Sequence, residues 1–230
     1  MKKTTLLGIA TGTQRLLFCS LAVSAALLTA CTESAPETVA TEQQSSPGAN
    51  SATLSPLEAC MHLDGLNIAA AVIGLPTSGA SITSVEHVNA EADGNINGEF
   101  CKVLGAIHPV DYTAPDIIFE VNLPTQWNRK TLQFGGGGLN GSVITGLGLY
   151  AKQPESEDTP LARGYVTLGS DSGHQSAGGF DGRFYLNEEA LENFGRMQIK
   201  KTHDVAMWLI GQRYGSESDY NYFIGGSQGG

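Results

Sequence analysis

The 230 residues are enough for one or two globular domains, and a composition of 41% hydrophobic and 16% charged residues is typical of a chain that buries a core. The formal net charge of −10 excludes a nucleic acid as a partner, because its phosphates would have to bind against the protein's own field. The 29 glycines are nearly twice the usual share of roughly 7%, and the excess falls at positions 135–141, 178–182 and 225–230.

The N-terminus has the pattern of an export signal. Two lysines and Arg15 precede an apolar run over residues 16–30, which ends in small residues directly before Cys31. The run is shorter than the roughly 20 residues of a membrane span and has the apolar core and cleavage site of a secretory signal. We therefore predict that residues 1–30 are a signal peptide.

Residues 28–31, Leu-Thr-Ala-Cys, resemble a bacterial lipobox, in which the cysteine becomes the lipid-carrying first residue. The alternative is an ordinary signal peptide with a chance cysteine. We expect lipidation of Cys31, a lipid anchor to a membrane and a periplasmic or cell-surface location, as in an outer-membrane lipoprotein. Residues 31–56 are rich in Ser, Thr, Ala, Pro, Glu and Gln and contain no aromatic residue, which predicts a flexible tether.

Two cysteines, Cys60 and Cys101, remain after position 31. In an oxidising compartment such a pair is most simply a disulfide. A metal site is the alternative, but it lacks further nearby ligands. Closing a loop of this length stabilises a fold by roughly 4 kcal/mol when only chain entropy is counted.

The first half of the body contains one predicted helix and three predicted strands. Residues 57–71 carry apolar side chains at roughly helical spacing and break at Gly74-Leu75-Pro76, which predicts a helix. Residues 101–107, 117–123 and 131–134 predict strands. In the second of these, apolar side chains alternate with Glu120 and Asn122, which is typical of a half-buried strand.

The second half contains two further strands around one long helix. Residues 164–170 predict a strand that ends in the polar loop 171–174, and residues 219–224 predict the last strand. Between them we expect a helix over residues 188–214 that is capped by Asn187, kinked at Gly195 and stopped by Gly215. This order of elements predicts an α/β fold with a mainly parallel sheet and helices on its faces.

Two glycine-rich segments follow predicted strands. Residues 136–141 fit the dinucleotide fingerprint G-x-G-x-x-G. Export argues against this interpretation, and so does the acidic residue expected about 20 positions on, since Glu155, Glu157 and Asp158 fall in a polar loop. Residues 225–229 fit G-x-S-x-G, in which a serine projects from a sharp strand-to-helix turn that only small flanking residues allow. The two motifs in this order favour a serine hydrolase over structural turns.

At these motifs the body resembles the tannase and feruloyl esterase family of α/β-hydrolases, which includes a hydrolase of mono(hydroxyethyl) terephthalate. The resemblance runs from about Cys60 to Gly230. The segments that carry it, in the family's order, are Leu123-Pro-x-x-Trp127-Asn128, the glycine loop 135–141, the stretch from Gly164-Tyr165 to Asp171-Ser172-Gly173-His174, and Tyr222-Phe223-Ile224-Gly225, with the early pair Cys60 and Cys101.

The resemblance implies specific roles. Ser227 would be the nucleophile, and the backbone N–H groups of Gly138 and Gln228 would form the oxyanion hole. Asp171 and His174 match positions that support the loop below the site, because the acid and the histidine of the triad follow the serine in this fold. Residues 57–230 would then be the N-terminal part of the catalytic domain, with only the N-terminal half of the sheet of an α/β-hydrolase.

The sequence departs from the family in two ways. Gly226 stands where the family has a cysteine that is bonded to another beside the catalytic histidine. None of the five histidines follows Ser227, so the triad acid, its histidine and the lid are not in these residues. We therefore expect an N-terminal fragment of a longer protein that is inactive alone. A calcium ion would belong to the lid, and no cofactor or metal is expected in the part shown.

The resulting hypothesis is an exported serine esterase that cleaves small aromatic carboxylic esters of the feruloyl, galloyl or terephthalate type through an acyl-enzyme. The aromatic specificity depends on the resemblance alone. Two alternatives stay open. One is a non-catalytic, surface-binding lipoprotein that keeps the glycine turns as architecture, and the other is a general carboxylesterase or exported peptidase on the same fold.

Overall fold

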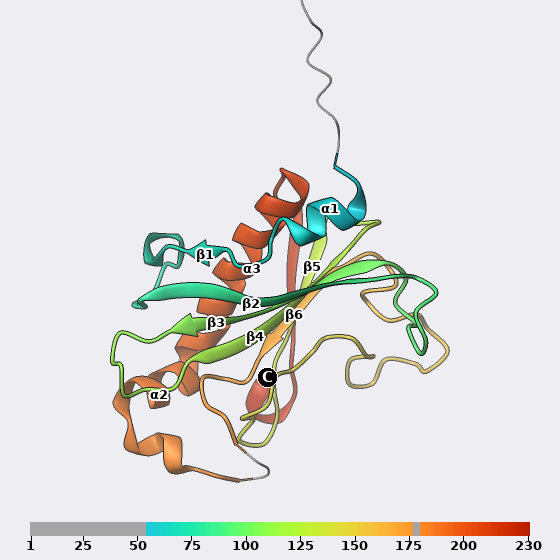
Figure 1. Ribbon diagram of the computed structural model, residues 1–230. Helices are drawn as coiled ribbons and strands as arrows, with labels where there is room; N and C mark the ends of the chain where they lie inside the picture. Colours follow the sequence, from blue (N-terminus) through green and yellow to red (C-terminus); the bar gives the residue numbers. More distant parts are fainter. Residues whose placement is uncertain (1–53, 177–179) are drawn as a thin grey trace, which may run out of the picture. The chain divides into compact units, whose positions relative to one another are not determined.

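A seven-stranded mixed sheet organises the protein, shown in Figure 1 as a computed structural model that describes residues 54–176 and 180–230. The predicted signal peptide, Cys31 and nearly all of the predicted tether lie outside the described residues. In order along the chain, the strands are β1 (Asn67–Ile68), β2 (Gly79–Val88), β3 (Phe100–His108), β4 (Ile117–Pro124), β5 (Lys130–Phe134), β6 (Val166–Ser170) and β7 (Tyr220–Ile224).

The helical elements in the described residues are short, apart from the long helix α3. They are α1 (Pro56–Met61), the 3₁₀ turns η1 (Ala70–Val72), η2 (Arg183–Leu186) and η4 (Ser227–Gly229), the helix α2 (Glu188–Glu192), the π-helical turn η3 (Asn193–Met197), and α3 (Gln198–Tyr214). None of the helices in the described ranges has the length and apolar character needed to cross a bilayer.

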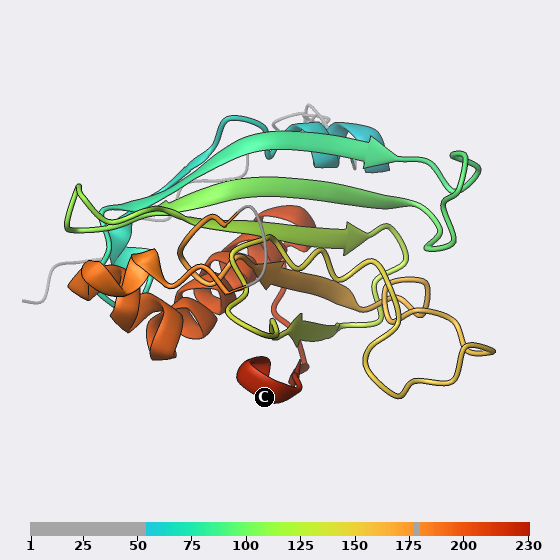
Figure 2. The ribbon, with the colours of Figure 1, turned by 90° about the horizontal axis from the view of Figure 1, so that it is seen from below.

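The sheet order is β1-β2-β3-β4-β6-β5-β7, and Figure 2 shows β2, β3, β4, β6 and β5 side by side. Only β6, β5 and β7 are parallel to one another, whereas the pairs from β1 to β6 are antiparallel. The prediction of a mainly parallel sheet is therefore wrong. The loops that join β2 to β3 and β3 to β4 are too short for the crossover of a dozen or more residues that parallel neighbours need.

The predicted strands are all present, but the first helix is not as expected. Helix α1 begins at Pro56 behind a Ser55–Glu58 capping box, and it ends at Met61 instead of continuing to residue 71. Gly65, with φ of 67°, turns the chain, and β1 then pairs with β2, so pairing to the sheet overrides the helical spacing. Strand β2 was missed because a bulge between Ile82 and Ser84 interrupts its alternation.

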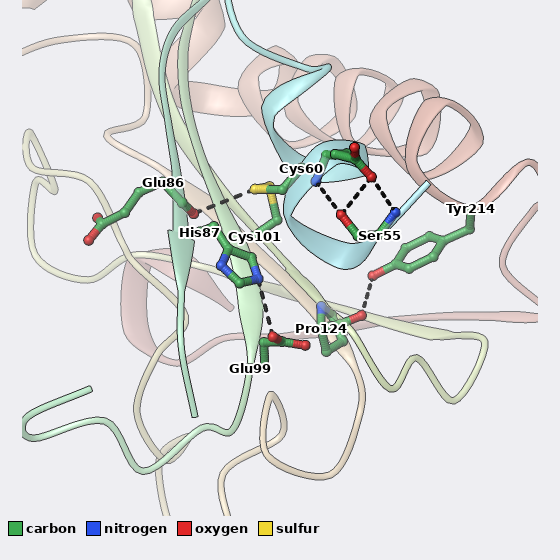
Figure 3. The surroundings of a disulfide bond; sticks show 9 residues. Ser55, Cys60, Glu86, His87, Glu99, Cys101, Pro124 and Tyr214 are labelled. Atoms are coloured by element: carbon green, nitrogen blue, oxygen red, sulfur yellow. Dashed lines mark hydrogen bonds and ion pairs between the residues drawn. A yellow bond between two sulfur atoms is a disulfide. The ribbon is translucent and has the colours of Figure 1, made fainter. Parts of the chain in front are cut away.

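The predicted disulfide is present and joins α1 to β3 (Figure 3). The Cα atoms of Cys60 and Cys101 are 5.4 Å apart, and both residues are fully buried. In the same region Tyr214, at the end of α3, donates a 2.7 Å hydrogen bond to the carbonyl of Pro124. The first helix and the long helix are thus both fastened at this end of the sheet, and the metal alternative for the two cysteines is excluded.

The long helical segment lies where it was predicted and carries an interruption. Asn187 caps it by accepting a hydrogen bond from the N–H of Ala190, and Gly215 stops it with φ of 64°. The π-helical turn η3 contains Gly195, the residue expected to kink the helix. Helix α3 crosses one face of the sheet, as Figure 1 shows.

The core lies between α1, α3 and one face of the sheet, where the apolar side chains of β3, β4 and β6 pack. Strand β4 is buried on its other face too, since Glu120 and Asn122 are almost inaccessible. The segment after β5 covers that face, and Asn122 donates a 2.7 Å hydrogen bond from Nδ2 to the carbonyl of Thr145. The prediction of a half-buried strand is therefore wrong, because a loop covers the polar face.

Candidate functional site

Three loops meet at one end of the sheet. They follow β5, β6 and β7, and they comprise residues 135–141, 171–176 and 225–230. Since these three strands are parallel neighbours, their carboxyl ends lie at the same edge, where sites in open α/β sheets are found. Figure 2 shows the C-terminal turn beside the end of β5. We call this edge the glycine end and the opposite edge, near Cys60 and Cys101, the disulfide end.

Ser227 occupies a sharp turn directly after β7. Gly226 is extended, Ser227 has φ of 56°, and the 3₁₀ turn η4 begins at the serine. A left-handed conformation is uncommon for a residue with a Cβ atom, and the nucleophilic serine of an α/β-hydrolase occupies a strained turn of this kind. Ser227 is exposed, so its hydroxyl is accessible to a ligand.

The backbone of this turn packs directly on the loop after β5. A Cβ atom added to Gly225 or to Gly135 would overlap the carbonyl oxygen of Gly229, and one added to Gly229 would overlap Gly136. The N–H of Gly135 also donates a 2.8 Å hydrogen bond to the carbonyl of Ile224. The glycines are therefore required by the close approach of two backbones. This contact brings together the two glycine motifs that the sequence analysis singled out.

Two backbone N–H groups on these segments are candidate donors, those of Gly138 and Gln228. Gly138 has φ of 59° and nothing within 4 Å of the position of a Cβ atom. Gln228 follows Ser227 in η4. Among the residues that the structure describes, neither N–H donates a hydrogen bond to the protein. Both groups are thus free to donate to a ligand.

Asp171 fixes the loop after β6 and lies away from solvent. Its Oδ1 accepts hydrogen bonds from the N–H groups of Ile118 and Gly173, at 3.1 and 2.9 Å, and its Oδ2 accepts one from Gln175 Nε2 at 2.6 Å. The residue is 1% exposed, and burial raises its pKa from 3.8 to about 6. All of these contacts bind the loop to itself and to β4, which is the structural role expected for this carboxylate.

His174 packs between the glycine loop and an aromatic layer. Its ring stacks on Phe184 with centroids 3.8 Å apart, and its Nε2 lies 3.1 Å from the position of a Cβ atom on Gly141. It is nearly inaccessible, and burial lowers its pKa, so the neutral imidazole is favoured. The position fits the structural role expected for this histidine.

The sequence analysis gave no role to Asn140 or Ser172, although both lie in segments that carry the family resemblance. Asn140 Nδ2 donates hydrogen bonds to the carbonyl of Ser170 at 3.0 Å and to Ser172 Oγ at 2.8 Å, and both Asn140 and Ser172 have positive φ. The only signal for them in the sequence was an asparagine directly before Gly141, because asparagine tolerates the left-handed region.

The dinucleotide alternative is not supported by the local structure. That fingerprint needs a helix to begin at the glycine loop, so that the helix N-terminus can face a pyrophosphate. All residues from 135 to 165 are described, and they form neither helix nor strand. Within the described ranges there is also no group of three or more His, Cys, Asp or Glu side chains that could hold a metal ion.

Comparisons with known proteins show which family the chain is similar to. The sequence profile of the family described as tannase and feruloyl esterase matches residues 101–230. An uncharacterised esterase of Agrobacterium fabrum is 49% identical over 74% of the chain and 31% of its own length, and a mono(2-hydroxyethyl) terephthalate hydrolase of Piscinibacter sakaiensis is 28% identical over 57% of the chain and 23% of its own length.

A crystal structure of an esterase from Aspergillus oryzae superposes with a TM-score of 0.52 at 23% identity, over 70% of the chain and 32% of that protein. The fold is therefore that of the α/β-hydrolases, of which the described sheet is one part. The matched part of the chain spans about a quarter to a third of the length of these relatives. Because the family profile matches residues 101–230 and the Agrobacterium protein is 49% identical, the chain belongs to the tannase and feruloyl esterase family.

Proposed function

We propose that the intact protein is a carboxylic ester hydrolase that acts through Ser227. The observation that carries the proposal is the contact between the loop after β5 and the turn after β7, with a left-handed, exposed serine in that turn. A serine nucleophile and a glycine-rich donor loop are the two parts that acyl transfer needs at the same place.

In the proposed reaction Ser227 Oγ adds to the ester carbonyl carbon while a base takes the hydroxyl proton. The carbonyl π electrons move to oxygen, and the N–H groups of Gly138 and Gln228 donate hydrogen bonds to the resulting oxyanion. Collapse expels the alcohol, which takes the proton from the base, and water then cleaves the acyl-enzyme by the same steps. The base and its acid would follow the serine in chain order, in the portion that the longer relatives have.

For the substrate we propose a small aromatic carboxylic ester. The family is described by its tannase and feruloyl esterase activities, and one relative is named for a terephthalate monoester. We also propose, from the sequence pattern, that the protein is exported. Residues 1–30 would be the signal peptide, Cys31 would carry the lipid, and residues 31–56 would form the tether.

The test is ester hydrolysis by the intact protein, purified from the membranes of the source cell. We expect turnover of methyl ferulate, methyl gallate or mono(2-hydroxyethyl) terephthalate, with kcat/KM at least about 10-fold above that for an aliphatic ester of similar size. Ser227→Ala should lower kcat by at least about 10³-fold without changing the melting temperature. An intact, folded protein without any ester hydrolysis would refute the proposal.

The other outcomes identify the two alternatives. Equal kcat/KM for aromatic and aliphatic esters, still abolished in Ser227→Ala, would indicate a general carboxylesterase. Binding of aryl esters without turnover, unchanged in Ser227→Ala, would indicate a surface-binding lipoprotein.

A further inference from the structure

Strained backbone is concentrated at the glycine end. In the described part of the chain, five residues other than glycine have φ in the left-handed region. Arg129 and Lys152 lie on other, exposed parts of the chain. Asn140, Ser172 and Ser227 each lie on one of the three loops that meet at the glycine end. Residues in such conformations persist only where the surrounding structure holds them, and they cluster at functional sites.

One amide holds two of these residues. Asn140 Nδ2 donates to Ser172 Oγ at 2.8 Å and to the carbonyl of Ser170 at 3.0 Å, and the Asn140 N–H donates to the carbonyl of Gly137 at 3.0 Å. Ser170 ends β6, and Ser172 is 1% exposed. Backbone hydrogen bonds of Gly141 with Asp171 and Ser176 hold the C-terminal end of the glycine loop against the loop after β6. The Asn140 amide adds a side-chain anchor one residue earlier, next to the glycines that precede it.

The same side chain reaches the turn that carries the serine. A Cβ atom on Gly136 would lie 2.5 Å from Asn140 Oδ1, so the amide rests against the backbone of Gly136. Gly136 in turn contacts Gly229, two residues after Ser227. A continuous path of contacts thus runs from Ser172 through Asn140 and Gly136 to η4.

We propose that Asn140 is a positioning residue for the esterase reaction. It holds residues 135–138 so that the N–H of Gly138 faces the carbonyl oxygen of an ester attacked by Ser227. This inference rests on the proposed function. Asparagine suits the task because it tolerates φ of 41° and supplies two amide hydrogens. An aspartate would supply none and would place a carboxylate oxygen against the carbonyl of Ser170.

Asn95 provides a matched control. Its Nδ2 also donates to two oxygen atoms, the carbonyls of Asn89 and Gly98, at 2.8 and 2.7 Å. It lies in the loop between β2 and β3, at the disulfide end, and its φ is not positive. The two asparagines share their hydrogen-bond chemistry and differ in place.

The experiment compares Asn140→Ala, Asn140→Asp and Asn95→Ala in the intact protein with an aryl ester. We expect kcat to fall about 10-fold to 100-fold in both Asn140 variants, with KM changed less than about 3-fold, because the oxyanion forms only in the transition state. Complete loss of one oxyanion donor lowers kcat by about 10²-fold to 10³-fold, and a displaced donor should cost less. Asn95→Ala should keep the wild-type kcat.

Asn140→Gly keeps the test valid if Asn140→Ala does not fold. Glycine adopts φ of 41° without strain, and it lacks the anchoring amide. The glycine variant should fold and lose kcat as Asn140→Ala does. Wild-type kcat in a folded Asn140→Gly protein, or an equal loss in Asn95→Ala, overturns the inference while the proposed function stands. A wild-type protein without ester hydrolysis overturns the proposed function first and the inference with it.

Discussion

The two ends of the sheet are held together by different kinds of contact. At the disulfide end, α1 is bonded to β3 and Trp127 stacks on Tyr214 with ring centroids 4.4 Å apart. At the glycine end, backbones approach so closely that Cβ atoms are excluded, and three residues other than glycine hold left-handed conformations. The first arrangement stabilises the fold, whereas the second costs stability and places polar groups. Changes at the disulfide end should therefore lower stability alone, and changes at the glycine end should lower activity.

The largest effect on activity is expected from Gly225→Ala. The added methyl group would overlap the carbonyl of Gly229 and push the serine turn off the loop after β5. We expect kcat to fall by at least about 10³-fold, as for loss of a strong transition-state contact. Gly226→Ala is the matched control, because Gly226 is extended and a Cβ atom there meets nothing within 4 Å. Equal losses in both variants would contradict the account of this turn.

The largest effect on stability is expected at the disulfide end, from the double change Cys60→Ser and Cys101→Ser. The disulfide spans a sequence separation of 41, so its loss should lower the free energy of unfolding by about 4 kcal/mol. Denaturant melts of the intact protein, with reduced wild type as a second comparison, would measure this. The kcat of the folded variant should stay within about twofold of wild type. A large loss of kcat in folded protein would show that the two ends are coupled.

The pH dependence of stability should show the raised pKa of the Asp171 carboxyl group. Its pKa is raised from 3.8 to about 6 in the folded protein, so its contribution is most favourable below pH 3.8 and is lost as the pH rises through about 6. Relative to Asp171→Asn, the wild type should lose about 3 kcal/mol of unfolding free energy between about pH 3.5 and about pH 7. Urea melts of both proteins across that range would test this, and a constant difference would contradict it.

The smallest effect is expected from Tyr214→Phe at the disulfide end. The change removes the hydrogen bond to the carbonyl of Pro124 and keeps the ring stacked on Trp127. We expect the unfolding free energy to fall by about 1 kcal/mol and kcat to remain unchanged. Thermal melts and initial rates of the same preparation would check both. A larger change in kcat than in stability would contradict the assignment of this end to stability.

The sequence predicted the elements whose signals are local. The strands from residue 101 onward, the cap at Asn187 and the stop at Gly215 follow from alternation and capping chemistry. The short α1, the strand β2 and the burial of Glu120 could not be predicted in this way. Each depends on a partner distant in sequence: β1 pairing with β2, a bulge against β3, and a loop that covers β4.

At the site, too, features with a local sequence signal could be predicted and features that depend on a distant partner could not. The motif around Ser227 and the glycine loop are visible in the sequence because they need glycine at fixed spacing. Asn140 and Ser172 carry no such spacing, and their link crosses from one loop to another. Only the structure brings them together.

The most direct test of the account is covalent labelling of the intact protein with a fluorophosphonate, followed by peptide mass spectrometry. A serine activated for acyl transfer reacts with this probe, and an ordinary surface serine does not. We predict one phosphonylated residue, Ser227, with loss of ester hydrolysis in step with labelling and no labelling of Ser227→Ala. Labelling of a different serine, or continued ester hydrolysis by Ser227→Ala, would contradict the central claim.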